Sequence, residues 1–150
     1  MFGPHVTFDF YGCNSKKLSD TKFIHKILDE LPEMIGMHKI SDPNVTFFPG
    51  NPSSFDKGGV SAFVLIAESH ITIHTFIQDR FASVDIFSCN EFDIEKSTKY
   101  LMEKLGAKKV ERNFIERGKE FVKHYPDDVQ KAKTIVTKQR PRFEVAPLQP

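Results

Sequence analysis

The sequence predicts an α+β fold, a two-layer sandwich in which two helices pack on one face of a mostly antiparallel sheet. Segments with helical spacing alternate with strand-like runs in the order strand, helix, several strands, helix, strand. The short connection at residues 77–80 joins two of the strand-like runs, which is typical of a hairpin. The 150 residues suit one compact domain.

Six runs predict strands and two predict helices. Apolar alternation or a short apolar run indicates strands at residues 6–11, 45–48, 59–67, 69–76, 81–88 and 108–115. The first helix follows Asp20, its predicted N-cap, and is expected to end at Pro32 and Gly36. The second follows Asp93 and ends before Gly106. The run at 59–67 is nearly all apolar, so we expect it in the centre of the sheet.

The predicted domain covers residues 1–118, and residues 119–150 read as a C-terminal extension or tail. The tail is basic and mostly polar, and prolines interrupt it at positions 126, 141, 147 and 150. A short helix at 127–136 is the one regular element expected there.

Composition narrows the class of function. The formal net charge is +1, so no global field is expected to gather nucleic acid or an anionic membrane. No apolar run approaches the roughly 20 residues that span a bilayer, and no secretory signal is recognised at the first residues. Two cysteines make no disulfide framework. A reducing cytoplasm is therefore the expected location, and neither nucleic acid nor a membrane is an expected partner.

The segment 67–76 carries the most informative residues. Glu68 and Ser69 open a strand-like run, His74 follows the serine by five positions, and Cys89 follows it by twenty. A serine converts to a pyruvoyl group when its hydroxyl reaches the preceding carbonyl and a base removes its α-proton. His74 has a suitable imidazole. An odd spacing puts Ser69 and His74 on opposite faces of a regular strand, so this chemistry requires a bend at Ser69.

Four linked motifs resemble those of the small prokaryotic S-adenosylmethionine decarboxylases, which are self-processing pyruvoyl enzymes. That family carries Gly-Val-Ser, Glu-Ser-His, Ile-His-Thr and Asp-x-Phe-x-Cys segments. This chain has all four in one register, at 59–61, 68–70, 73–75 and 85–89. Its Phe-Tyr-Gly-Cys at 10–13 is also similar to the family's first strand, and the resemblance covers roughly residues 3–117.

The resemblance implies a mechanism and a set of residues. Cleavage falls between Glu68 and Ser69, and residue 69 becomes the pyruvoyl cofactor, with no metal. His74 and Ser61 assist processing, and Cys89 returns a proton to the substrate carbon after CO2 leaves. The pyruvoyl ketone forms a Schiff base with the substrate amine and acts as an electron sink. The product serves polyamine (spermidine) synthesis, and a homodimer of processed protomers is expected.

Two positions depart from the family pattern. Phe76 stands where Trp is frequent, and Gln78 stands where a Glu usually binds the ribose hydroxyls. Gln can hydrogen-bond a diol without the strength of a charged acceptor. Phe55 and Phe76 are candidates to enclose an adenine. These changes leave open a pyruvoyl-dependent arginine or ornithine decarboxylase on the same scaffold.

Plainer interpretations stay beside these. The chain is alternatively an unprocessed module that binds a nucleoside or a polyamine. Ser69 is alternatively a plain serine at a strand start, and His74 a core histidine or, with His70, a metal ligand. Cys89 is alternatively a small buried residue, as Cys13 is expected to be. For Phe55 and Phe76, core packing competes with stacking on a ligand.

Overall fold

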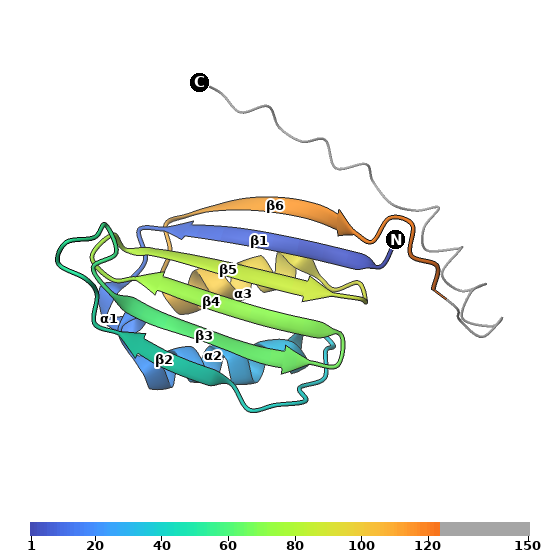
Figure 1. Cartoon of the computed structure of the whole chain (residues 1–150), viewed down its shortest axis with the longest axis horizontal. Helices are drawn as coiled ribbons and strands as arrows, with labels where there is room; N and C mark the ends of the chain where they lie inside the picture. The colour runs from blue at the N-terminus through green and yellow to red at the C-terminus, as the bar shows by residue number, and fades with distance from the viewer. Residues whose placement is uncertain (124–150) are drawn as a thin grey trace, which may run out of the picture.

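The computed structural model describes residues 1–123, which form a single sheet backed by helices (Figure 1). The elements in chain order are β1 (Gly3–Tyr11), α1 (Ser15–Leu18), α2 (Thr21–Met34), β2 (Asn44–Phe48), β3 (Gly59–Ile66), β4 (Ser69–Phe76), β5 (Phe81–Ser88), α3 (Ile94–Leu105) and β6 (Lys109–Arg117). The six strands are ordered β2-β3-β4-β5-β1-β6, and each neighbouring pair is antiparallel. The predicted α+β sandwich is confirmed, and the expected helix at 127–136 lies outside the described residues.

Both predicted helices begin at the predicted caps. The Asp20 carboxylate accepts the Phe23 N–H at 3.0 Å at the start of α2. The Asp93 carboxylate accepts the Lys96 N–H at 2.9 Å at the start of α3, and Gly106 ends that helix with φ 65. Both helices lie behind the sheet in Figure 1, and no other described element covers the face turned to the viewer.

The structure differs from the sequence analysis in one helix boundary and in one helix that was missed. Pro32 lies inside α2, which continues to Met34, because a proline in the last turn removes only one hydrogen bond from the helix. Gly36 then takes φ 76 and the Met37 N–H bonds the Pro32 carbonyl, so the chain turns there as expected. The single turn α1 was not predicted, because its four residues are too few for a periodic pattern.

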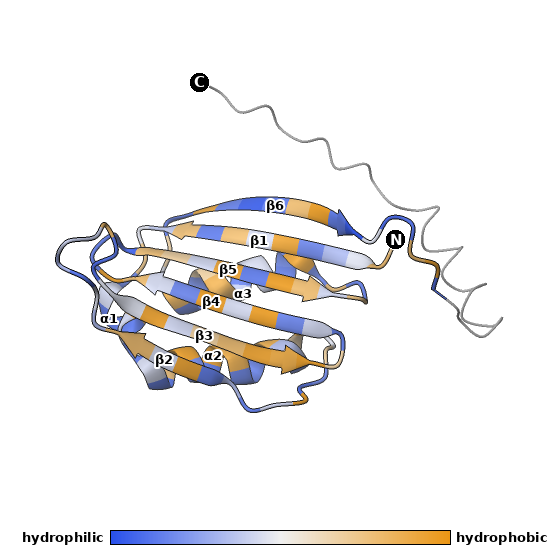
Figure 2. Ribbon diagram, viewed as in Figure 1, coloured by the Kyte–Doolittle hydropathy of each residue, from blue (hydrophilic) through white to orange (hydrophobic). Residues whose placement is uncertain are grey.

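The core fills the space between the sheet and the helices. Alternate residues of each interior strand point into it, and the matching stripes of α2 and α3 close it. Figure 2 shows hydrophobic and hydrophilic residues alternating along the strands. Its largest fully buried side chains include Phe8, Phe10, Leu28, Leu31, Ile66, Ile71, Ile73, Ile86 and Leu101. Cys13 is also fully buried, as predicted.

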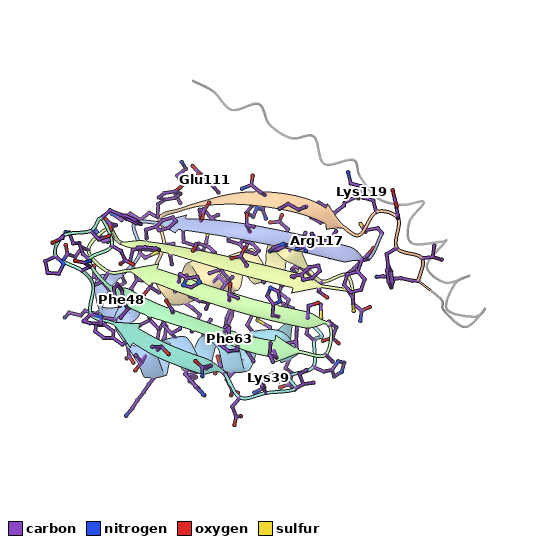
Figure 3. The ribbon with its side chains drawn as sticks, viewed as in Figure 1. Lys39, Phe48, Phe63, Glu111, Arg117 and Lys119 are labelled. Atoms are coloured by element: carbon purple, nitrogen blue, oxygen red, sulfur yellow. The ribbon has the colours of Figure 1, made fainter. Side chains whose placement is uncertain are left out.

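Within residues 1–123, no helix lies on the opposite face of the sheet, which we call the open face. Figure 3 views this face directly, and Phe63 and Arg117 are labelled on it. β3 lies next to the edge strand β2, so the predicted central position is wrong. Its residues alternate between buried and exposed, and Phe63 and Leu65 are each 43% exposed. The apolar run therefore combines a core stripe with an apolar stripe on the open face.

Candidate active site

The peptide bond predicted to break lies in the tight connection between β3 and β4. Ile66 and Ser69 are paired across this hairpin, and Ala67 and Glu68 form its two-residue turn. Ser69 also pairs with Ser88 at the end of β5, which places Cys89 just beyond the pair. Glu68, Ser69 and Cys89 therefore form one group at this end of the sheet, which we call the Ser69 cluster.

The carbonyl group of Glu68 is held by a backbone donor. The N–H of Cys89 donates to the Glu68 carbonyl oxygen at 2.8 Å. Attack on this carbonyl by the neighbouring hydroxyl would place negative charge on that oxygen. A fixed N–H at this distance stabilises such an oxyanion. The Ser69 cluster therefore contains a backbone donor suited to an oxyanion at Glu68, whereas the cysteine was predicted for its thiol.

Ser69 has an unusual backbone conformation. Its φ is 151, and within residues 1–123 Arg80 is the other non-glycine residue with positive φ. Residues other than glycine rarely adopt this backbone conformation. One such residue destabilises the fold by roughly 1–3 kcal/mol. The bend that the sequence required at Ser69 is therefore present as a strained residue. Because φ describes rotation about the N–Cα bond, loss of the nitrogen from residue 69 would remove this strain altogether.

The side chain of Glu68 is buried, with the residue only 6% exposed. His38, in the loop after α2, donates its backbone N–H to one carboxylate oxygen at 3.0 Å and approaches the other with Nδ1 at 2.8 Å. Burial alone raises the pKa of Glu68, but the hydrogen bonds from the His38 side chain and backbone outweigh it, so that pKa lies below 4.5. The carboxylate is therefore ionised at neutral pH and held at both oxygens.

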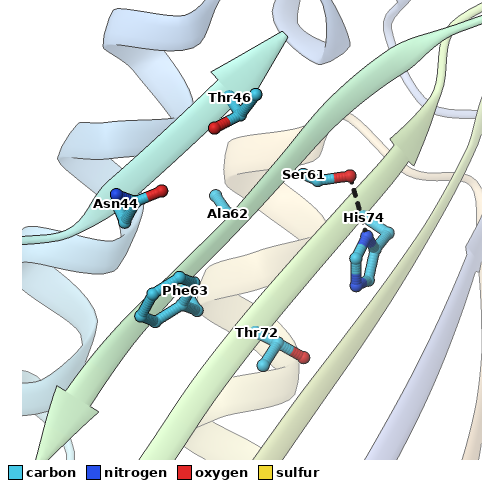
Figure 4. A pocket seen from close by; sticks show the side chains of 7 residues that line it. All are labelled: Asn44, Thr46, Ser61, Ala62, Phe63, Thr72 and His74. Atoms are coloured by element: carbon cyan, nitrogen blue, oxygen red, sulfur yellow. Dashed lines mark hydrogen bonds between the residues drawn. The ribbon is translucent and has the colours of Figure 1, made fainter. Parts of the chain in front are cut away.

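A second group lies farther along β4 on the open face. Ser61 and His74 face each other across β3 and β4, and His74 Nδ1 lies 3.1 Å from the Ser61 hydroxyl (Figure 4). They line a hollow of about 260 Å³ together with Asn44, Thr46, Ala62, Phe63 and Thr72. His74 is exposed, so the alternative of a core histidine is wrong. We call Ser61 and His74 the His74 cluster.

The two clusters are separate within one chain. Ser69 and His74 are five positions apart on one strand, which corresponds to about 16 Å at about 3.3 Å per residue. Ser69 is paired with Ile66 and Ser88 at the hairpin end of β4, whereas His74 lies farther along the strand on the open face. The structure therefore does not bring His74 to the serine of its own chain.

The predicted substrate-binding residues lie at the His74 end of β4. Phe76 closes the strand and packs on Phe81, with ring centroids 5.6 Å apart, while Gln78 is exposed in the following turn. Phe55 lies in the loop between β2 and β3 and is 83% exposed, which excludes core packing for this ring. Phe76 and Gln78 thus follow His74 in the chain, and the loop that carries Phe55 enters β3 at Gly59, at the same end of the β3–β4 pair.

Cys89 and Cys13 lie in different environments. Cys89 is partly buried and the Lys123 amine donates to its carbonyl oxygen, so the tail begins beside the Ser69 cluster. Cys13 is enclosed, and burial raises the pKa of its thiol to about 11. The fully buried alternative therefore applies to Cys13 and not to Cys89.

The described residues also bear on metals and membranes. No group of three or more His, Cys, Asp and Glu residues within positions 1–123 could hold a metal ion, so the proposal of His70 and His74 as ligands has no support. None of the helices in the same range is long and apolar enough to cross a membrane.

His38 and the buried Ser88 are the neighbours of the Ser69 cluster that sequence reasoning missed.

The fold is that of a known decarboxylase. The chain is similar to the crystal structure of the adenosylmethionine decarboxylase from Aquifex aeolicus, with a TM-score of 0.66 and 27% sequence identity. The similarity covers 84% of this chain and 97% of that one. A two-layer α+β protein of the decarboxylase type is therefore the class that the fold and the motifs define.

Sequence comparisons make the assignment specific. A family model described as S-adenosylmethionine decarboxylase matches residues 4–118. Proteins named S-adenosylmethionine decarboxylase proenzyme are 37% identical over 118 residues in Clostridium botulinum (78% of this chain, 95% of the relative) and 35% identical over 133 residues in a Geobacillus strain (89% and 97%). An archaeal relative from Saccharolobus islandicus is 36% identical over 123 residues (81% and 93%). This chain belongs to the S-adenosylmethionine decarboxylase family.

Proposed function

We propose that this protein is a proenzyme that cleaves itself between Glu68 and Ser69 and then decarboxylates S-adenosylmethionine for polyamine synthesis. The observation that carries the proposal is the strained Ser69 following a carbonyl that is already bound to the Cys89 N–H. The relatives quoted above are all named S-adenosylmethionine decarboxylase proenzyme, which leaves the arginine, ornithine and binding-module alternatives without support.

The proposed self-processing uses the residues of the Ser69 cluster. The Ser69 hydroxyl oxygen attacks the Glu68 carbonyl carbon, the C–N bond between the residues breaks, and an ester replaces the amide. Removal of the Ser69 α-proton then breaks the Cβ–O bond, so Glu68 leaves as a carboxylate and residue 69 becomes dehydroalanine. Water adds to the imine form of that residue, releasing ammonia and leaving a pyruvoyl group at the start of the α chain.

The proposed decarboxylation needs few protein groups. Residue 69 would carry the pyruvoyl group, which would supply the electron sink for decarboxylation. Cys89 is the proposed acid, because its thiol lies one residue beyond the strand that pairs with Ser69. Phe55 and Phe76 would enclose the adenine, and Gln78 would bind the ribose hydroxyls as a neutral partner. No step in this scheme requires a metal.

The separation of the two clusters supports a homodimer in which each active site is shared. His74 cannot act on the serine about 16 Å along its own strand. We propose that a second copy covers the open face and brings its Ser61, His74 and substrate-binding residues to the Ser69 cluster. The open face has apolar residues for such a contact, since Phe63, Leu65 and Ile115 are each 43–44% exposed.

The proposal is tested by the intact mass of freshly purified protein under denaturing conditions. We expect two fragments that divide at 68/69, the larger without a free amino terminus, and CO2 release from S-adenosylmethionine but not from arginine or ornithine. The Ser69→Ala variant is the control and should stay a single inactive chain. A wild-type protein that remains uncleaved during incubation, or a Ser69→Ala variant that decarboxylates equally well, would refute the mechanism.

A further inference from the structure

We propose that His38 is a positioning residue for self-processing. It holds Glu68 so that the turn cannot relax, and the distortion of the hairpin falls on Ser69. The proposal rests on the self-cleavage proposed above, but its central claim about strain is testable in a chain that cannot be cleaved.

The location of the positive φ is the first observation. A two-residue hairpin normally has positive φ at one or both of its turn residues. Here the turn residues are Ala67 and Glu68, yet within the described chain positive φ occurs at the following residue, Ser69, and at neither of them. The unfavourable φ therefore lies at the first residue of β4 and not in the turn. That first residue, Ser69, is the one that must react.

The contacts of His38 supply a physical reason. Its backbone N–H lies 3.0 Å from one Glu68 carboxylate oxygen, and its Nδ1 lies 2.8 Å from the other. An ionised carboxylate only accepts hydrogen bonds, so Nδ1 carries the proton and donates it. Both oxygens of a buried side chain are thus fixed by one residue that lies thirty positions earlier in the chain.

The segment around His38 is itself fixed to the hairpin. The His38 carbonyl accepts the Ala67 N–H at 2.8 Å, and the Ile40 N–H donates to the Leu65 carbonyl at 3.1 Å. Between them, Lys39 forms an isolated antiparallel β-bridge with Ile66. This segment therefore runs along the end of β3 like a short extra strand. It holds the turn on one side while the Cys89 N–H holds the Glu68 carbonyl on the other.

This arrangement also suits the products of cleavage. Release of the ester would create a new α-carboxylate on Glu68, next to a side-chain carboxylate that is already ionised. Two negative charges on one residue repel each other, and the two N–H groups of His38 offset the side-chain charge. His38 would therefore act on the carbonyl side of the bond while groups near Ser69 move the protons.

The first test measures processing of full-length His38→Ala and His38→Asn proenzymes after synthesis, as the fraction cleaved against time. We expect His38→Ala to slow cleavage at least tenfold, and His38→Asn, which keeps a side-chain N–H, to stay within about threefold of wild type. Equal rates for wild type and His38→Ala would overturn the proposal. A His38→Asn protein as slow as His38→Ala would overturn the role of the side-chain donor.

The second test separates positioning from general stability and requires no cleavage. The urea midpoints of Ser69→Gly and Ser69→Ala are compared with His38 intact and with His38→Ala. If His38 places the strain on Ser69, the advantage of glycine over alanine should fall by at least half when His38 is removed. A merely structural His38 would lower all midpoints and leave that difference unchanged, which would refute the proposal. A wild-type chain that never cleaves would refute the proposed function while this comparison still tests His38.

Discussion

Replacing Ser69 by glycine should stabilise the fold more than replacing it by alanine. Neither variant has the hydroxyl needed for cleavage, so both are single uncleaved chains and their stabilities are comparable. The φ of 151 at this position is unfavourable for any residue with a Cβ and ordinary for glycine. The ranking is the reverse of that expected in a normal strand, where glycine is the weaker residue.

The size of the effect follows from two opposing terms. Relief of the strain contributes about 1–3 kcal/mol. The extra backbone entropy of glycine in the unfolded chain lowers the free energy of unfolding by about 0.5–1 kcal/mol relative to alanine. With the middle of each range, about 2 and about 0.75 kcal/mol, Ser69→Gly is therefore expected to exceed Ser69→Ala by about 1 kcal/mol in the free energy of unfolding. With a slope of about 1–3 kcal/mol per molar urea for a small domain, a difference of several tenths molar in the midpoint is typical.

Urea unfolding followed by circular dichroism measures this difference, and Ser83 provides a matched control. Ser83 lies within β5, is paired with His74 and Asp9, and has no positive φ. In the uncleavable Ser69→Ala background, Ser83→Gly should be less stable than Ser83→Ala by about 0.5–1 kcal/mol. If the Ser83 pair behaves in this way and Ser69→Gly is no more stable than Ser69→Ala, Ser69 is unstrained and the reasoning fails.

Three further results are expected. Co-expression of Ser69→Ala and His74→Ala chains should restore cleavage of the His74→Ala chain, because a mixed dimer contains one complete shared site; no cleaved chain in purified mixed dimers would contradict a shared site. Gln78→Glu should lower the KM for S-adenosylmethionine about fivefold, because a charged acceptor adds about 1 kcal/mol to the ribose contact; an unchanged or raised KM would contradict that contact. Cys13 should resist alkylation at pH 8 until the chain unfolds, because burial raises the pKa of its thiol to about 11. Cys89, which is partly buried, should react in the folded protein, and mass mapping would show which cysteine is labelled. Prompt labelling of Cys13 would contradict its burial.

The pH dependence of stability offers a further test at Glu68. Its folded pKa lies below the unfolded value, so its ionisation contributes stability that is fully present above about pH 4.5 and is lost as the pH falls through the folded pKa. In the uncleavable Ser69→Ala background, Glu68→Gln should flatten the decline of the unfolding free energy below about pH 4.5. Parallel curves for the two chains, measured by urea unfolding between pH 3 and 6, would show that the His38 contacts do not stabilise the carboxylate.

Local patterns were sufficient for most of the fold. The strands β4 and β5 have the predicted bounds, since each is a short alternating run between turn residues. The caps Asp20 and Asp93 also lie where expected. The position of β3 was predicted wrongly for a physical reason. A continuous apolar run can mean that helices bury both faces of the strand, or that they bury one face while the other face stays exposed and apolar.

The site was less predictable than the fold. The family resemblance assigned His74 to the processing of Ser69, whereas strand geometry separates the two residues in the structure. The strain at Ser69 is visible only in the backbone, although the odd spacing required some bend there. His38 had no sequence signal, because its contact with Glu68 spans thirty residues and comes from an irregular loop.

The shared site that we propose follows from the two-layer architecture. A single layer of helices can cover one face of the sheet, so every second residue of β3 and β4 stays on the open face. The hollow beside His74 measures about 260 Å³, and pockets that bury a drug-sized ligand usually measure about 300–1,000 Å³. A nucleoside substrate therefore needs a second wall. The open face of another copy would supply that wall. The same contact would bring the His74 of that copy to Ser69 of the first chain, which the first chain's own His74 does not reach.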